Sequence, residues 1–425
     1  MLAGPWERAV IKGATVITVQ YVLPKRMEKK MTTLGVSVYP DIRPLDEIVT
    51  YFALASKYGF TRVFSSMFSV EGTNEEVLAL FRDFNAAAHE YGMRVSLDIN
   101  PECMDRLGAT PQDLSVFADI KADILRMDGA YGEDDNVAML QNPYGMQIEY
   151  NASALQADQI IALVERGVSK DRILACHNFY PQRYTGFRWD KFCAVNDRLA
   201  ALDIPIGAFV ASQVPGTHGV WDPPCGLPTV ERLRDYPADL QARILAAAKT
   251  TDVFFGNAYA SEAELAAVQE AFVPVEPHYV SAAHKRQVDS YASYAGSDLD
   301  LANQKKVRVE PVFDLLDVEK TILFDFFPHI DMGDSSEWIW RDRSPRLFFQ
   351  DQAIVPRRYP NDYFQVGDVV MVNDNYKHYA GEVQVVLEPI KNDGTRNLVG
   401  RINAEELTIF DVIGDGDIVV FMPAR

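Results

Sequence analysis

Cysteine and the common cofactor-binding motifs are scarce in this sequence. Among its 425 residues there are four cysteines, and no two of them form a C-x-x-C pair. No H-E-x-x-H motif, P-loop or G-x-G-x-x-G motif occurs. These absences argue against a disulfide scaffold, a zinc site and a dinucleotide-binding fold. We therefore expect no metal and no other cofactor, and reduced thiols at Cys103, Cys176, Cys193 and Cys225.

Positive charge and long apolar runs are also in short supply. The formal net charge is −19, which argues against a nucleic-acid partner, because such a partner needs clustered cations. The apolar run Ala14–Leu23 is too short to cross a bilayer. We expect residues 1–30 to lie outside the fold, with Met31 as the functional start and a cytoplasmic location; a cleaved signal peptide is the alternative. The sequence predicts no membrane partner and leaves the oligomeric state open.

Residues 31–273 alternate short apolar runs with amphipathic stretches, a pattern typical of β-α units around a parallel sheet. Eight such units in about 240 residues predict a (β/α)₈ TIM barrel. The predicted strands are Leu34–Tyr39, Arg62–Met67, Arg94–Ile99, Ile124–Asp128, Gln147–Asn151, Ile173–Phe179, Ile206–Ala211 and Asp252–Asn257. The predicted helices are Leu45–Tyr58, Asn74–Tyr91 with Asn74 as its N-cap, Ala154–Arg166, Trp189–Leu202 and Pro237–Lys249.

Residues 274–425 are richer in β-type runs. Turn clusters at 373–375 and 392–394 separate them, so we expect a second, compact antiparallel barrel or sandwich. Its arginines are interpreted as either a phosphate clamp or a solvated face. The predicted strands are Gly367–Val372, Gly381–Leu387, Leu398–Ile402 and Asp417–Met422, and the arginines are Arg341, Arg343, Arg346, Arg357 and Arg358.

Polar side chains gather where the predicted barrel strands end, which is where TIM-barrel enzymes build their active sites. Because side chains alternate along a strand, Asp128 shares the inner face with Arg126, and Glu149 shares it with Asn151. These acids either form a site or merely neutralise Arg126. The candidate substrate-binding residues are Tyr39, Asp98, Asn151, His177, Asn178, Tyr180, Gln213, His218 and Asn257.

Asp128 and Glu149 lie on neighbouring predicted strands, as two carboxylates flanking one glycosidic bond would. We predict Asp128, held ionised by Arg126, as nucleophile or stabiliser. Glu149, in a more apolar setting near Tyr150 or Phe179, is predicted as the acid; the reverse assignment stays open. Aromatic residues suited to stacking on a sugar ring occur in the strand-end loops. They are Tyr39, Phe68, Tyr131, Tyr180, Tyr184, Trp221 and Tyr259.

Several of these stretches resemble the bacterial 6-phospho-N-acetylmuramidases, long labelled as outer surface protein homologues. The resemblance runs from Met31 almost to the C-terminus. It is carried by LGVSVYP (34–40), LRMDGAYG (125–132), IEYNAS (148–153), NFYPQRYTG (178–186), GLPTVERLR (226–234), FFGNAYAS (254–261) and VNDNYKHYAGEVQV (372–385).

The resemblance implies a TIM barrel joined to a cyclophilin-like β-barrel domain. It also implies hydrolysis of the β-1,4 bond between 6-phosphorylated N-acetylmuramic acid and N-acetylglucosamine, a phosphorylated amino-sugar disaccharide, during peptidoglycan recycling. Two alternatives remain. Asp98, Asp128, Glu149 and His177 could instead ligate a divalent metal in a sugar isomerase or epimerase, or the protein could be a noncatalytic carbohydrate-binding protein.

Overall fold

The computed structural model describes residues 32–67, 70–153, 156–219, 225–276, 278–294 and 303–424. By its internal contacts the chain divides into Met1–Lys30 and Met31–Arg425, and the second unit is the subject here. The expectations for residues 1–30, Phe68 and Trp221 concern positions outside the described residues.

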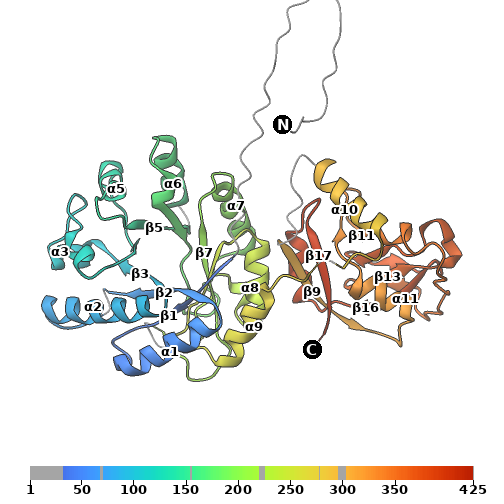
Figure 1. Ribbon diagram of the computed structural model, residues 1–425, viewed down its shortest axis with the longest axis horizontal. Coiled ribbons are helices and arrows are strands. Elements are labelled where there is room, and N and C mark those ends of the chain that lie inside the picture. Colours follow the sequence, from blue (N-terminus) through green and yellow to red (C-terminus); the bar gives the residue numbers. More distant parts are fainter. Residues whose placement is uncertain are drawn as a thin grey trace, which may run out of the picture. The chain divides into compact units, whose positions relative to one another are not determined.

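Eight parallel strands close into a barrel in chain order, which confirms the predicted TIM barrel (Figure 1). Predicted and observed strands agree to within three residues at each end. The strands are β1 (Thr33–Ser37), β2 (Phe60–Ser66), β3 (Arg94–Ile99), β4 (Ile124–Met127), β5 (Gln147–Asn151), β6 (Ile173–Cys176), β7 (Ile206–Val210) and β8 (Asp252–Phe255).

Helices surround this barrel. They are α1 (Leu45–Lys57), α2 (Asn74–Glu90), α3 (Pro101–Leu107), α4 (Ser115–Asp119), α5 (Glu133–Leu140), α6 (Gln156–Glu165), α7 (Trp189–Ala200), α8 (Ala238–Ala247) and α9 (Glu262–Phe272). Within the described residues, no helix has the length and apolar character needed to span a membrane.

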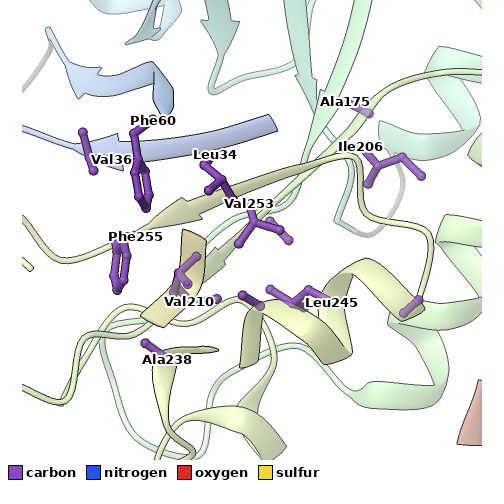
Figure 2. Packing of buried hydrophobic residues seen from close by; sticks show 14 of the residues in the cluster. Leu34, Val36, Phe60, Ala175, Ile206, Val210, Ala238, Leu245, Val253 and Phe255 are labelled. Carbon is purple, nitrogen blue, oxygen red and sulfur yellow. The ribbon is translucent and has the colours of Figure 1, made fainter. Parts of the chain in front are cut away.

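The main hydrophobic core lies between the strands and these helices. Val36, Val63 and Val95 are fully buried on the outward faces of β1, β2 and β3, because alternate residues of a strand point to opposite faces. Figure 2 shows the same arrangement where Leu34 and Val253 pack with residues of α8 such as Leu245. Each such side chain contributes roughly 1.5–3 kcal/mol by burial.

The N-cap of helix α2 lies one residue before its predicted position, and the helix begins at Asn74. Thr73, and not Asn74, is the N-cap: its hydroxyl accepts from the backbone of Glu76, whose carboxylate accepts from the Thr73 backbone. This reciprocal capping box satisfies two backbone donors of the first turn. Asn74 instead donates from its side chain to the Arg106 carbonyl at 2.6 Å.

The C-terminal part forms a seven-stranded sheet in the order β10-β17-β9-β16-β13-β14-β11. It is not wholly antiparallel as predicted, because β9 and β17 pair in parallel. Helix α10 (Ala282–Tyr294) precedes it. The strands are β9 (Gln304–Pro311), β10 (His329–Ile330), β11 (Ile339–Asp342), β13 (Asp368–Val372), β14 (Val383–Val386), β16 (Arg396–Arg401) and β17 (Ile418–Pro423), with β12 (Tyr363–Phe364) and β15 (Ile390–Lys391) forming a separate pair.

The two edges of this sheet meet each other. His329 of β10 and Asp342 of β11 share a hydrogen bond of 2.8 Å between Nδ1 and Oδ2, and both side chains are buried. This contact leaves the sheet nearly closed, as the predicted second β-barrel requires.

Buried ion pairs join α8 to the C-terminal part. Arg243 binds both carboxylate oxygens of Glu406 at 2.6 and 2.7 Å, and Arg308 binds Asp239 at 2.7 Å. Arg243 also lies 3.5 Å from Asp239, so two cations and two anions balance within one cluster. Glu406 belongs to the 3₁₀ helix η6 (Glu406–Asp411).

Most of the C-terminal arginines are also paired with acids. Arg341 and Arg343 bind Asp334 at 2.6 and 2.9 Å, and Arg346 binds Glu382 at 2.9 Å. Arg357 binds the buried carboxylate of Glu319 at 2.5 Å. Ion pairing of this kind favours a structural role for these four side chains over a phosphate clamp.

Candidate active site

The interior of the barrel is aromatic and charged where aliphatic side chains are usual. Phe64, Phe209 and Phe254 form a buried cluster, with Phe64 and Phe209 edge to face at 5.2 Å. Two arginines project into the same interior. Arg62 lies 4.8 Å from the Phe254 ring, and Arg126 lies 5.9 Å from the Phe64 ring.

The first arginine, Arg62, reaches across the interior from β2 to β5 and β8. It binds Glu149 at 2.8 Å and Asp252 at 3.3 Å, and it also donates to the Ser96 hydroxyl. Arg62 and Glu149 are both almost completely buried. The second oxygen of Glu149, Oε2, is buried without a hydrogen-bond partner, so this carboxylate is enclosed within the barrel.

The second arginine, Arg126, belongs to β4. It binds residues nearer the carboxyl end of the barrel, which we call the mouth. Its guanidinium binds Asp98 at 2.6 Å and donates to the side-chain oxygen of Asn178. The register aligns Asp98, Arg126 and Glu149 in one row across β3, β4 and β5. Arg126 could face either acid in this row, and it pairs with Asp98.

Asp128 lies one step beyond this row. It directly follows β4, and its backbone N–H donates to the Ile99 carbonyl at 2.8 Å, which continues the pairing with β3. Its side chain is half-buried and makes no hydrogen bond within the described residues. Asp128 therefore places a carboxylate without a hydrogen bond, within the described residues, at the mouth.

Negative charge exceeds positive charge in this region. Arg62 and Arg126 face four carboxylates, those of Asp98, Glu149 and Asp252 together with Asp128. Burial is the main cause that raises the pKa of Asp98 to about 6; Arg126 opposes this rise, and the charge of Asp128 adds to it. Uptake of a proton by Asp98 relieves part of an uncompensated buried charge.

Comparison with known proteins connects this site with a family. The N-terminal model of the 6-phospho-N-acetylmuramidases matches residues 34–270, and the C-terminal model matches residues 306–422. The chain belongs to the 6-phospho-N-acetylmuramidase family. The family name implies a glycoside hydrolase.

Solved structures similar to this muramidase-family chain share its architecture. The crystal structure of an uncharacterized B. cereus protein is 28% identical, with a TM-score of 0.75 over 92% of this chain and 99% of that one. A conserved protein from Enterococcus faecalis is 22% identical, with a TM-score of 0.58 over 92% and 96% of the two chains; at this identity it supports the fold alone. No curated protein matches the chain.

Among the predicted site residues of this muramidase-family barrel, the structure brings together Asp98, Asn178, Asp128 and, one row deeper than Asp128, Glu149. Tyr39 lies in the interior aromatic cluster, and its hydroxyl donates to the Gly256 carbonyl at 3.1 Å. Asp98 and Glu149 belong to β3 and β5, while Tyr39, Asp128 and Asn178 follow the ends of β1, β4 and β6.

His177 lies outside this group. It is fully buried between β6 and α7, with Nε2 donating to Asn196 Oδ1 at 2.8 Å and Nδ1 3.3 Å from the Ser153 hydroxyl. Burial lowers its pKa to about 4. Since alternation turns His177 away from its neighbours Cys176 and Asn178, its side chain packs against α7 and does not lie with the residues of the interior.

Other predicted residues brace the loops of the mouth. Asn257 accepts from the Ser212 and Leu227 backbones, each at 3.2 Å. His218 pairs through its backbone with Ala258. The remaining three are held by local hydrogen bonds: Asn151 to Ser153, Gln213 to the Arg234 carbonyl, and the Tyr180 backbone to the Pro228 carbonyl.

Sequence reasoning missed Arg62 and Asp252, which decide the environment of Glu149. Arg62 is the third residue of β2 and Asp252 the first of β8, and each lies two residues before an inward phenylalanine, Phe64 or Phe254. The available signal was the spacing Arg-x-Phe and Asp-x-Phe, because residues two apart in a strand point to the same face.

The proposed metal ligands do not converge in this family member. Asp98 pairs with Arg126, Glu149 pairs with Arg62, and His177 faces α7. Within the described ranges, no three His, Cys, Asp or Glu side chains are grouped as metal ligands would be. The four residues of the isomerase alternative are therefore not gathered around one point in the described residues.

Proposed function

We propose that this protein hydrolyses the β-1,4 bond between N-acetylmuramic acid 6-phosphate and N-acetylglucosamine, releasing both sugars. The observation that carries the proposal is a family match spanning the barrel whose mouth holds Asp128, a carboxylate free of any hydrogen bond in the described residues. Glycoside hydrolysis requires such a carboxylate, which stabilises or attacks the anomeric carbon, together with an acid that protonates the leaving oxygen.

The charge of the mouth supports this chemistry. The anomeric carbon becomes positively charged in the oxocarbenium-like transition state. An excess of carboxylates over guanidiniums around Asp128 stabilises that developing charge more than the neutral ground state. The aromatic cluster of Phe64, Phe209 and Phe254 beneath it excludes water and strengthens the effect.

The 6-phosphate contributes binding energy away from the reacting bond. A net-negative interior would repel it, so we propose that the phosphate lies toward the rim of the mouth. Arg183 is a rim cation, 40% exposed and paired with Asp235 at 2.6 Å. If the phosphate replaced Asp235 as the partner of Arg183, this ion pair would hold the sugar in place for the reaction.

We further propose that the reaction takes place in the cytoplasm, as one step of peptidoglycan recycling. The substrate carries a phosphate, so a phosphoryl-transfer step must precede this hydrolysis.

The test is turnover of a chromogenic N-acetylmuraminide with and without a 6-phosphate. We expect kcat/KM to be at least ~10²-fold higher for the phosphorylated substrate, the low end of what a positioning interaction contributes. Equal values for both substrates would contradict the assigned specificity. Absence of turnover with either substrate, and with the disaccharide itself, would contradict the hydrolase proposal.

A further inference from the structure

Asp128 has an acid on each side, and only one of the two can be the proton donor. Asp98 and Glu149 lie on the neighbouring strands β3 and β5, each one row deeper than Asp128. Neighbouring strands are about 4.8 Å apart and two residues advance about 6.6 Å, so each acid has its Cα about 8 Å from that of Asp128. Backbone position alone does not separate them, so their surroundings must.

Glu149 is enclosed. Its side chain is 1% exposed, one oxygen binds Arg62, and the other is buried without a partner. A proton donor must come within hydrogen-bond distance of the leaving oxygen. With 1% of its side chain exposed and one oxygen bound to Arg62, the carboxylate of Glu149 is poorly placed to make that contact.

Asp98 is less enclosed than Glu149 and is anchored by Arg126. Its Oδ1 accepts from Arg126 at 2.6 Å, while Oδ2 makes no hydrogen bond in the described part of the chain. The side chain keeps 9% of its surface exposed, and Asn178 holds the far side of Arg126. One oxygen is thus fixed and the other remains available to the mouth.

We infer that Asp98 donates the proton to the leaving oxygen, and that Glu149 is a positioning residue that holds Arg62 beneath the site. This assignment rests on the proposed hydrolase function and names its acid. It differs from the expectation that Glu149 is the donor.

The step balances as follows. Asp98 Oδ2–H gives its proton to the glycosidic oxygen while the bond from that oxygen to the anomeric carbon breaks, and the oxygen keeps the electron pair and leaves as a hydroxyl. The carboxylate of Asp128 stabilises the positive charge on the anomeric carbon. Water then adds its oxygen to that carbon and returns a proton to Asp98. Arg126 stabilises the Asp98 carboxylate between the two events.

The raised pKa of Asp98, about 6, agrees with this role because burial favours its protonated form. An acid donor works only while protonated, so activity that depends on it is present below this pKa and falls as pH rises through it.

The experiment compares Asp98→Asn with Glu149→Gln, on the disaccharide and on a 6-phosphorylated nitrophenyl muraminide. Nitrophenolate leaves without a proton. We expect Asp98→Asn to lose at least ~10²-fold in kcat on the disaccharide and less than ~10-fold on the nitrophenyl substrate. Glu149→Gln should lose the same factor on both. Leaving-group rescue of Glu149→Gln instead of Asp98→Asn would overturn the assignment.

A pH profile supplies the second readout. The alkaline fall of kcat/KM near pH 6 should persist in Glu149→Gln and vanish in Asp98→Asn; its loss in Glu149→Gln would contradict the inference. If Asp98→Asn does not fold, the profiles of wild type and Glu149→Gln still decide it. Wild-type turnover of both substrates is required first, and its absence contradicts the hydrolase proposal itself.

Discussion

Two clusters of buried arginines and carboxylates lie in this molecule, one inside the barrel and one between α8 and the C-terminal sheet. At the α8 junction, Arg243 and Arg308 meet Asp239 and Glu406, so two positive charges face two negative charges. Inside the barrel, two guanidiniums face four carboxylates.

The difference in charge balance distinguishes a structural cluster from a catalytic one. In a balanced cluster the paired charges offset one another, so no net charge remains for an outside group to neutralise. An unbalanced one holds an excess charge that a proton or a cationic transition state relieves. Buried ion pairs by themselves therefore do not identify an active site, whereas the charge left over after pairing does. Three substitutions test the contrast.

The largest effect is expected at the balanced junction. Glu406→Gln leaves Arg243 buried with only Asp239 at 3.5 Å as a charged partner, and breaking a buried pair costs about 3–5 kcal/mol of unfolding free energy. Urea denaturation measures this. The control is Asp411→Asn, which removes an exposed partner of Arg232 and should cost less than ~1 kcal/mol. Comparable losses in the two variants would show that the junction cluster is not structural.

A smaller effect on free energy is expected at the unbalanced site. Asp128→Asn should lower kcat by at least ~10²-fold, equivalent to about 2.7 kcal/mol of transition-state free energy, on both leaving groups. Its Tm should stay level or rise, because one excess negative charge has gone. Activity assays and thermal melts of one preparation measure both. A joint fall of Tm and kcat would place Asp128 in a structural role.

The smallest effect is a pH dependence of stability. The pKa of Asp98 is about 6 in the fold against an ordinary 3.8, so the native state binds this proton more tightly than the unfolded chain does. Its contribution to the free energy of unfolding is then largest below pH 3.8 and decreases, by about 1–3 kcal/mol, as pH rises to about 6. Asp98→Asn should remove that decrease. Denaturation midpoints of both proteins at pH 4 and pH 7 give the comparison, and parallel changes would be inconsistent with a raised pKa.

Local patterns predicted much of this molecule. Apolar runs located all eight barrel strands, and alternation placed Asp98, Arg126, Asp128 and Glu149 on one inner surface. These features depend on residues that are close together in the sequence, so local patterns are enough to predict them. The same alternation applied to His177 would have turned it toward α7, away from the mouth.

The remainder depends on residues that are distant in sequence. Glu149 acquires its character from Arg62, 87 positions earlier, which crosses the barrel interior to reach it. Of the two aromatic residues expected to make the setting of Glu149 apolar, Tyr150 packs in the outer core, whereas Phe179 packs against Phe64 and Phe209 in the interior. In the C-terminal part, the parallel pairing of β9 with β17 joins strands more than 100 residues apart, which no local pattern encodes.

The bond between His329 and Asp342 has a consequence for behaviour at high concentration. An open sheet edge offers unpaired backbone groups to the edge of another molecule, which is a route to aggregation and fibre growth. Here the two outermost strands are only two and four residues long and are tied to each other. The sheet therefore offers a second copy of the chain only short edge strands whose side chains are already tied to each other.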